Sequence, residues 1–358
     1  MNRLKLAVIG TGALGRHHAR ILSHMPDVEL VAAVEPNPEI GKPVAEACRT
    51  EWLPDYNSIF ERIDAAVVVV PTALHLRVAR EFLSRGVHLL VEKPLASTVE
   101  QGRELVELAR EHNAVLQVGH VERFNPALQV AWDHIDDPKY IRAERLSPYS
   151  FRSTDIGVTH DLMIHDLDLI LSRVHSPIRR VDAFGVCLMG GREDLVQARL
   201  TFENGCVADL TASRVHPEAK RALHAWSANG CVSVDLTTKR VTQYSISPQL
   251  RYGVSPLDQS RQPGVDLALL KQQVFGEWID VAELEVPEQD ALTAELSHFL
   301  DCVRRGTTPL VDGVAGLKAL ELAEQIVAEV GRHQWDGHAT GAIGPHLLPF
   351  AKPKRHAA

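Results

Sequence analysis

The amino-acid sequence predicts an α/β protein with two domains. Three observations support this fold class: strand-like and helix-like segments alternate over the first 120 residues, a glycine-rich turn follows the first strand, and short strands joined by tight turns dominate afterwards. The alternation is typical of a doubly wound parallel sheet, and the later pattern of an α+β domain with an open, mainly antiparallel sheet. A chain of 358 residues has the length of two domains.

The first domain is expected to span residues 1–120. Its Val-rich run at 65–70 is typical of a strand buried on both faces of a parallel sheet. One helix has a clear start signal, because Ser97 and Thr98 are each followed three residues later by Glu100 and Gln101, as in a capping box. Strands are expected at Leu4–Ile9, Val28–Val34, Ala65–Val70, Val87–Val91 and Val115–Val118, and further helices at Gly15–Met25, Pro38–Cys48 and Leu76–Leu83.

The second domain is expected to span residues 121–335, followed by a tail at 336–358. Asn229-Gly230 is a strong hairpin signal between two β-rich segments. Residues 250–266 lack periodicity and are expected to form a loop, either a lid or a subunit contact. The expected strands are Val181–Leu188, Val196–Phe202, Cys206–Ala212, Cys231–Leu236 and Val241–Ile246, and the expected helices are Val158–Arg173, Ala291–Arg304 and Val314–Arg332.

The composition argues against several functional classes. A net charge of −8 disfavours binding to nucleic-acid backbones. The five cysteines form no CxxC pair, which indicates buried thiols in a reducing compartment. The longest apolar run is too short to span a bilayer, and the N-terminus lacks the pattern of a secretory signal. We therefore expect a cytoplasmic protein without nucleic-acid or membrane partners.

The turn from Gly10 to Gly15 has the spacing of a dinucleotide-binding loop. In such a loop the first glycine permits a tight turn, the second lets the backbone approach a pyrophosphate, and the third allows close strand–helix packing. The following helix supplies N–H donors for the phosphates. Gly10, Gly12, Ala13, Leu14 and Gly15 are therefore predicted to bind a cofactor, the alternative being a glycine turn with a purely structural role.

Glu35 ends the second expected strand, 20 residues after Gly15. A carboxylate at this position accepts hydrogen bonds from the adenosine ribose hydroxyls and repels a 2′-phosphate. Residues 36–38 are Pro-Asn-Pro and offer no arginine to bind that phosphate. NAD is therefore expected as the cofactor in preference to NADP.

Lys93 follows a buried strand and precedes Pro94, which favours an extended conformation at Lys93. Open α/β sheets bind ligands at the carboxyl ends of their strands. A lysine there can hydrogen-bond a substrate hydroxyl and, with a lowered pKa, help to remove its proton. The alternative is a surface lysine paired with Glu92.

Asp161 and His165 are four residues apart on an expected helix and share a face with Asp168. A carboxylate beside an imidazole fixes its tautomer and stabilises its protonated form, as an acid–base group requires. One alternative is a helix cap with an adjacent histidine. Another is a metal site at the doublets His160-Asp161 and His165-Asp166, but no further His/Asp set supports it and no metal is expected. A serine hydrolase is disfavoured because no G-x-S-x-G motif occurs.

In combination these motifs resemble those of the Gfo/Idh/MocA oxidoreductases over almost the whole chain, up to about residue 335. The resemblance implies a Rossmann domain and an α/β domain whose open sheet often forms oligomer contacts, so a homodimer or homotetramer is expected. It also implies that Lys93, Asp161 and His165 surround the nicotinamide ring and the reacting hydroxyl. The other matching positions are His18 after the glycine loop, Pro71-Thr72 with His75, and Glu92-Lys93-Pro94, of which Pro71, Thr72, His75, Glu92 and Lys93 are expected at the cofactor.

The segment 119–126 is similar to that of the UDP-N-acetylglucosamine 3-dehydrogenases in this family. This resemblance implies NAD-dependent oxidation of the 3-hydroxyl of a nucleotide sugar, with Lys93, Asp161 and His165 as the acid–base group. Arg123 and Asn125 are candidates to bind sugar or phosphate oxygens, unless Asn125 only caps a helix that starts at Pro126.

Several alternatives stay open. The substrate alternatives are myo-inositol, a hexose or another nucleotide sugar. An alternative of a different class is a non-catalytic dinucleotide-binding sensor or scaffold. Glu35 also departs from the Asp that is more usual in the family, which leaves the geometry at the ribose open.

Overall fold

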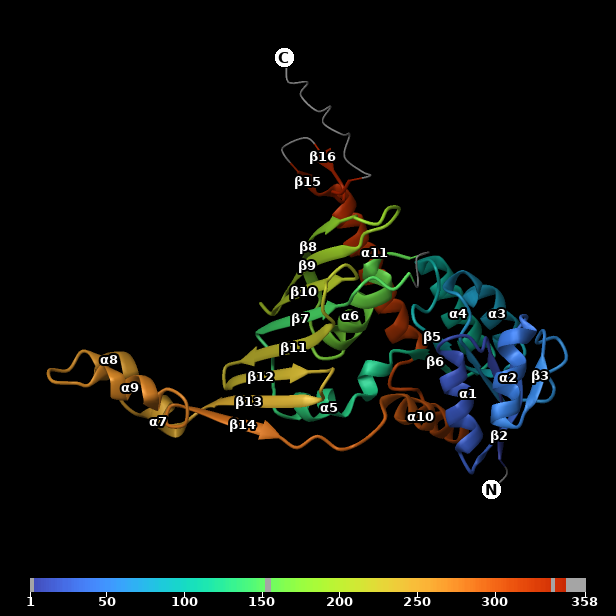
Figure 1. Cartoon of the computed structure of the whole chain (residues 1–358), viewed down its shortest axis with the longest axis horizontal. Helices are drawn as coiled ribbons and strands as arrows, with labels where there is room; N and C mark the ends of the chain where they lie inside the picture. The colour runs from blue at the N-terminus through green and yellow to red at the C-terminus, as the bar shows by residue number, and fades with distance from the viewer. Residues whose placement is uncertain (1–2, 152–155, 336–338, 346–358) are drawn as a thin grey trace, which may run out of the picture. The chain divides into compact units, whose positions relative to one another are not determined.

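The computed structural model describes residues 3–151, 156–335 and 339–345, and the chain divides into two compact units (Figure 1). The first unit comprises Met1–Phe124 and Gln289–Glu324, and the second comprises Asn125–Glu288 and Gln325–Ala358. The predicted fold class is confirmed in both units. The division differs from the predicted domains, because residues 289–324 belong to the first unit.

The first unit is built on a parallel sheet with the strand order β3-β2-β1-β4-β5-β6. The chain runs outward from β1 to β3, then starts again at β4 on the other side of β1, so the order reverses between β1 and β4. Ligands of such sheets bind outside the carboxyl ends of the strands at this point. The strands are β1 Leu4–Ile9, β2 Val28–Val34, β3 Glu51–Leu53, β4 Ala65–Val68, β5 His88–Glu92 and β6 Leu116–Gly119.

The helices of the first unit begin where the sequence signals placed them. Thr98 caps α4 by accepting a hydrogen bond from the Gln101 N–H, and the Gln101 side chain accepts one from the Ser97 N–H, each at 3.3 Å. The predicted start of this helix is therefore confirmed. The helices are α1 Gly15–His24, α2 Pro38–Cys48, the 3-10 turn η1 Thr72–Leu74, α3 His75–Leu83, α4 Val99–Glu111 and the 3-10 turn η2 Val121–Phe124.

Neighbouring residues of β1 enter two hydrophobic clusters, one on each face of the sheet. Ile9 belongs to a cluster with Phe82 of α3, whereas Val8 belongs to one with Phe299 of α10 (Ala291–Arg305). Since successive side chains of a strand point to opposite faces, the sheet needs cover on both. This explains why α10, which is distant in sequence, completes the first unit.

The second unit is built on a mixed, mainly antiparallel sheet with the order β14-β13-β12-β11-β7-β10-β9-β8. Only the pairing of β7 with β10 is parallel among its described strands. Helix α5 (Pro126–Asp133) packs on β12 and β13, and the turn η3 (Thr159–Met163) packs on β10. The strands are β7 Tyr140–Leu146, β8 Ile178–Val186, β9 Leu195–Phe202, β10 Val207–Ser213, β11 Lys220–Ser227, β12 Gly230–Asp235, β13 Arg240–Ile246 and β14 Ile279–Leu284.

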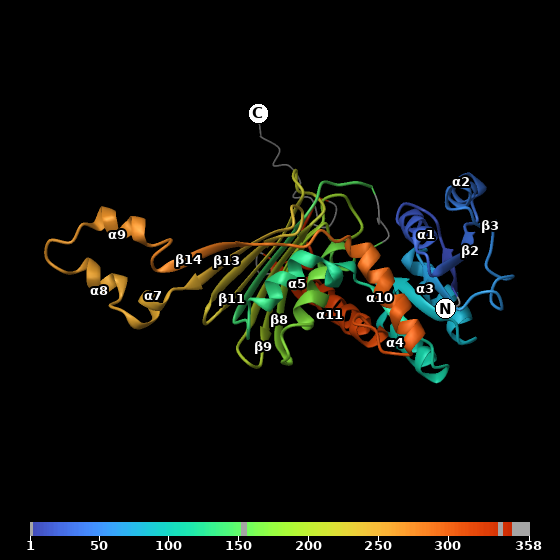
Figure 2. The same ribbon diagram turned by 90° about the horizontal axis from the view of Figure 1, so that it is seen from below.

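The segment expected as a loop at 250–266 is helical in part, so this prediction was wrong. Three short helices, α7 Pro248–Tyr252, α8 Pro256–Ser260 and α9 Leu267–Gln273, extend beyond β13 and β14 (Figures 1 and 2). The side chains of Ser247, Ser255 and Asp266 cap their first turns. Such local capping signals are compatible with short helices that have no hydrophobic periodicity.

The C-terminal part of the chain contains helix α11 (Gly313–Arg332), which begins in the first unit and ends in the second. The tail expected from residue 336 onward is partly structured, since β15 (Gln334–Trp335) pairs with β16 (Ala339–Thr340). Residues 336–338 and 346–358 of the predicted tail lie outside the described residues. Among the helices of the described ranges, none is long and apolar enough to cross a membrane.

Candidate active site

A cavity of about 590 Å³ lies at the carboxyl ends of β1, β2 and β4, where the strand order of the first unit reverses. Four residues predicted to bind the cofactor line it: Gly10, Gly12, Glu35 and Pro71. Ala13, Leu14, Gly15, Thr72, His75, Glu92 and Lys93 lie in the same unit but are not among its lining residues. The remaining lining residues are Ile9, Val34, Pro36, Pro54, Asp55, Tyr56, Asn57, Val69, Val70, Leu74, Arg77 and Val78.

The three glycines of the first turn meet different steric requirements. Gly10 has φ +89°, and a Cβ there would lie 2.5 Å from the Val69 carbonyl oxygen. A Cβ on Gly15 would lie 1.9 Å from the Gly10 carbonyl oxygen, whereas Gly12 faces open space. Helix α1 has no side-chain cap and no acidic residue in its first turn. Its first N–H groups and the open side of Gly12 therefore fit the pyrophosphate of a dinucleotide.

Backbone donors hold the Glu35 carboxylate beside the glycine turn. Its Oε2 accepts a hydrogen bond from the Thr11 N–H at 3.1 Å, and its Oε1 accepts one from the Asn37 N–H at 3.2 Å. The Trp52 Nε1–H donates to the Glu35 carbonyl oxygen at 3.0 Å, which fixes the end of β2. The carboxylate thus lies where the ribose of a dinucleotide bound to the glycine turn would need an acceptor.

Arg77 is a lining residue of this cavity that the sequence reasoning missed. That reasoning considered only residues 36–38 as a source of positive charge near the ribose. Arg77 reaches the cavity from α3, which follows a different strand, so its position depends on the packing of α3. No motif in the sequence marks it.

Lys93 follows β5, next to a buried hydrogen-bond network centred on Glu92. Glu92 is 7% exposed, and its Oε1 lies 2.9 Å from Nε2 of the fully buried His18. The Glu92 Oε2 accepts a hydrogen bond from the Lys93 N–H at 3.3 Å, and a Cβ on Gly119 would lie 2.8 Å from that oxygen. Because Glu92 is buried among these groups, the alternative of an exposed Lys93–Glu92 surface pair is excluded.

His75 supports the loop after β4. It is 1% exposed, with Nδ1 2.9 Å from the Pro94 carbonyl oxygen and Nε2 3.0 Å from the Val70 carbonyl oxygen. Burial lowers the pKa of His75, although both carbonyls and Glu92 oppose this. A neutral imidazole donates from one nitrogen only, so one of the two contacts is a hydrogen bond. His75 thereby links the cavity wall to the segment that carries Lys93, and its predicted contact with the cofactor stays a prediction.

Asp161 and His165 belong to the second unit and lie, half-buried, on a helix that starts with a π turn at Thr159–Met163 and continues as α6 (Ile164–Leu171). The capping position of this helix is Val158, so the alternative of Asp161 as a helix cap is wrong. π turns are rare and occur frequently at functional sites. The roles predicted for Asp161 and His165 therefore stay predictions with a suitable local structure.

The acidic neighbours on this helix have structural partners. Asp166 is buried and accepts hydrogen bonds from Arg145 of β7, at 2.8 Å from Nη2 and 3.1 Å from Nε. Asp168 is 2% exposed. In the ranges 3–151, 156–335 and 339–345, no group of three or more His, Cys, Asp or Glu side chains is arranged to hold a metal ion.

The two candidate substrate residues fall in different units. Arg123 is half-buried in η2 of the first unit. Asn125 begins the second unit and caps α5, accepting a hydrogen bond from the Ala127 N–H at 3.1 Å. This supports the structural alternative for Asn125, and the contacts of both residues with substrate stay predictions.

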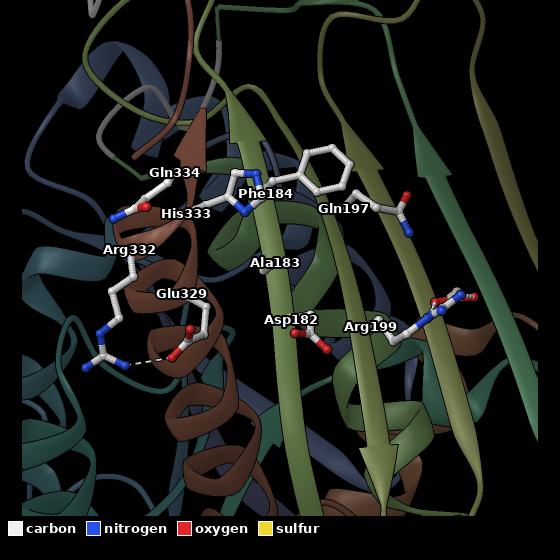
Figure 3. Close-up of a pocket in the computed structure, with 10 residues that line it drawn as sticks. Asp182, Ala183, Phe184, Gln197, Arg199, Glu329, Arg332, His333 and Gln334 are labelled. Carbon is white, nitrogen blue, oxygen red and sulfur yellow. Dashed lines mark hydrogen bonds and ion pairs between the residues drawn. The ribbon is translucent and has the colours of Figure 1, made fainter. Parts of the chain in front are cut away.

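A second large cavity, of about 580 Å³, lies on the exposed face of β8 and β9 in the second unit (Figure 3). Two ion pairs lie among its lining side chains. Arg199 Nε lies 2.7 Å from Asp209 Oδ1, and Arg332 Nη1 lies 2.6 Å from Glu329 Oε1. No glycine turn lies among the residues that line this cavity, so it is not the candidate active site.

Comparison with known proteins finds matches to two family models. The family model described as "Oxidoreductase family, NAD-binding Rossmann fold" matches residues 4–120, and the model described as "GFO/IDH/MocA C-terminal domain" matches residues 128–233. All the residues that line the first cavity fall within the first match.

Several curated relatives match most of the chain. UDP-N-acetylglucosamine 3-dehydrogenase of Acidithiobacillus ferrooxidans is 33% identical over 327 residues, which cover 91% of this chain and 97% of the relative. The NAD(+)-dependent scyllo-inositol 2-dehydrogenase of Bacillus subtilis is 26% identical over 341 residues, covering 90% and 92%.

Solved structures also align with most of the chain. The structure of the Acidithiobacillus ferrooxidans enzyme aligns with a TM-score of 0.80 at 32% identity, covering 92% of this chain and 98% of that one. Levoglucosan dehydrogenase in complex with NADH aligns with a TM-score of 0.78 at 18% identity, covering 92% and 97%, and shows likeness of fold.

Proposed function

The chain belongs to the Gfo/Idh/MocA oxidoreductases, which bind NAD through a Rossmann fold, and from this membership we propose that it oxidises a secondary hydroxyl of a sugar to a ketone. The proposed substrate is UDP-N-acetylglucosamine, oxidised at its 3-hydroxyl. The 33% identity with a UDP-N-acetylglucosamine 3-dehydrogenase, over 97% of its length, supports this substrate.

One observation in the first unit carries the proposed chemistry. Lys93 directly follows β5, and β5 neighbours β4, whose end forms part of the 590 Å³ cavity. Parallel strands end at the same edge of the sheet, so Lys93 lies at the edge where the cofactor cavity opens. This location supports the proposal that Lys93 acts on the group that reacts with a bound nicotinamide.

We assign roles to four side chains. The Lys93 ammonium donates a hydrogen bond to the reacting hydroxyl oxygen and stabilises the negative charge that develops on it. His165, oriented by Asp161, accepts the hydroxyl proton. NAD, when bound, supplies the acceptor for the hydride that leaves the same carbon. Glu35 accepts hydrogen bonds from the ribose hydroxyls and gives the preference for NAD over NADP.

A second candidate substrate is an inositol, because scyllo-inositol 2-dehydrogenase also matches 90% of the chain. Both reactions oxidise a ring carbon that bears a secondary hydroxyl, so Lys93, Asp161 and His165 would serve in either. The two substrates differ in the nucleotide, which only UDP-N-acetylglucosamine carries.

The test is to mix the protein with NAD and, in separate reactions, UDP-N-acetylglucosamine, other UDP-sugars, scyllo-inositol, myo-inositol and hexoses, and to follow reduced nicotinamide. We expect turnover with UDP-N-acetylglucosamine at the highest kcat/KM. If an inositol gave the highest kcat/KM, the proposed substrate would be wrong and an inositol would take its place. Tight NAD binding without turnover of any substrate would favour a dinucleotide-binding sensor.

A further inference from the structure

The turn between β8 and β9 lies against the start of the helix that carries Asp161 and His165. Its consecutive residues Glu193 and Asp194 are buried, with exposures of 9% and 0%. Carboxylates are rarely buried in proteins unless they have partners. The contacts of these two side chains therefore indicate what the turn supports.

Glu193 packs directly beneath the first residues of the helix. A Cβ on Gly157 would lie 2.0 Å from the Glu193 Oε1 and 2.3 Å from its Cδ, so the Glu193 carboxylate occupies the space that any other residue at 157 would need. The same Oε1 also accepts a long hydrogen bond from the Thr159 N–H, at 3.4 Å. The Val158 N–H also donates to the Glu193 carbonyl oxygen, at 3.0 Å.

Asp194 fixes the same turn from the other side. Its Oδ2 accepts hydrogen bonds from the Leu188 and Met189 N–H groups, both at 2.7 Å, and its Oδ1 lies 2.8 Å from Arg214 Nε. The Arg214 Nη1–H donates in turn to the Ile156 carbonyl oxygen at 2.9 Å. Arg214 therefore anchors residue 156, and Glu193 anchors residues 157–159.

This support lies at the point where the helix departs from α geometry. The π turn at Thr159–Met163 contains Asp161 and sets its register relative to His165, which follows in α6. π turns are rare and occur frequently at functional sites. The Glu193 carboxylate fills the space beside Gly157 and lies near Thr159, the residue at which this π turn begins.

We propose that Glu193 is a positioning residue for the acid–base helix: its carboxylate, packed against Gly157, sets the start of the helix and thereby the placement of Asp161 and His165 at the reacting hydroxyl. This inference rests on the proposed function of Asp161 and His165. Displacing a catalytic group by about 1 Å can cost about 100-fold in rate even when the mutation is remote.

The experiment compares Glu193→Asp, Glu193→Gln and Gly157→Ala with the matched control Glu203→Asp, which makes the same change at an exposed position in the next turn of the sheet. Asp is one methylene shorter and withdraws the carboxylate, whereas Gln keeps the shape and an acceptor oxygen. We expect Glu193→Asp and Gly157→Ala each to lower kcat by about 10–100-fold. Glu193→Gln should stay within about threefold of wild type, and the Kd for NAD should be unchanged because the glycine-turn cavity lies in the first unit.

The double variant Gly157→Ala/Glu193→Asp tests the contact itself. Shortening Glu193 makes room for the new Cβ, so the double variant should lose no more than the worse single variant, rather than the product of the two losses. Should Glu193→Asp fail to fold, Gly157→Ala probes the same contact from the helix side, with Glu193→Gln as its comparison.

Two results would overturn the inference. One is wild-type kcat in a folded Glu193→Asp, whatever the activity of Gly157→Ala. The other is an equal loss of kcat in Glu193→Gln and Glu193→Asp together with a lowered unfolding midpoint, which indicates a role in stability alone. The variant His165→Ala separates this inference from the proposed function: an inactive His165→Ala beside a fully active Glu193→Asp contradicts only the inference, whereas an active His165→Ala contradicts the function as well.

Discussion

His18 Nε2 of helix α1 lies 2.9 Å from Glu92 Oε1 at the end of strand β5, and His18 is completely buried. A buried hydrogen bond therefore connects the helix after the glycine turn to the strand that leads into Lys93. The Glu92 carboxylate also leaves no room for a side chain at Gly119, the last residue of the neighbouring strand β6.

Removing the imidazole should destabilise the protein through this contact. His18→Ala leaves the buried Glu92 carboxylate without its side-chain partner, which costs about 2–3 kcal/mol of unfolding free energy. The control is His17→Ala, which changes an exposed residue on the same helix. It should change the unfolding free energy by less than about 0.5 kcal/mol. Urea unfolding of both variants checks this. Equal stabilities would show that the His18–Glu92 contact contributes little.

Replacing the proposed base should abolish most of the turnover. Positioned acid–base catalysis contributes about 10²–10⁴ in rate, so His165→Ala should lower kcat by that factor. The Kd for NAD should hardly change, because the glycine-turn cavity lies in the other unit. His175→Ala, an exposed histidine just beyond the same helix, is the control and should keep wild-type kcat.

The cofactor preference should depend on Glu35. Glu35→Ser removes the charge that repels a 2′-phosphate, so the ratio of NAD to NADP affinity should fall by about 10-fold or more. The exposed Glu39→Ser on helix α2 should leave the ratio unchanged. Titration of both variants with NADH and NADPH measures it. Tighter binding of NADP than of NAD by the wild type would refute the assigned role of Glu35.

Stability should fall at alkaline pH because of a buried thiol. Burial raises the pKa of Cys206 to about 11, from about 9. Since the folded state favours the neutral thiol, this stabilisation is complete below pH 9 and is lost as the pH rises toward 11. This difference in pKa between the unfolded and folded states corresponds to about 2–3 kcal/mol of unfolding free energy. Comparing the unfolding free energies of wild type and Cys206→Ala at pH 8 and pH 10.5 tests this, and the loss should be smaller in the variant.

The sequence predicted those parts of the fold that depend on local signals. The strand–helix alternation, the capping box at Thr98 and the hairpin at Gly230 all rely on neighbouring residues, and each is present. Strand β7 was missed because Arg145 occupies a buried position in it and interrupts the apolar alternation. The side chain can be buried there because Asp166 pairs with it, which only the fold reveals.

Other features depend on tertiary contacts that no local pattern contains. Helix α10 was expected in the second domain but lies in the first compact unit, because its partner face, around Val8, is formed nearly 300 residues earlier in the chain. Arg77 escaped notice because α3 carries it to the cavity, and Glu193 because its partner is Gly157 rather than a neighbour in sequence. The glycine turn, Glu35 and Lys93 could be proposed as site residues from sequence because each lies at or near the end of a predicted strand.

The most direct test of the central claim is to supply UDP-N-acetylglucosamine labelled with deuterium at C3, together with NAD, and to determine the mass of the reduced nicotinamide formed. Transfer of hydride from the 3-position predicts reduced cofactor that carries one deuterium, and no such product from His165→Ala at comparable times. Reduced cofactor without deuterium would show that another carbon is oxidised. If no reduced cofactor formed although NAD was bound, the proposed oxidation of this sugar would be contradicted.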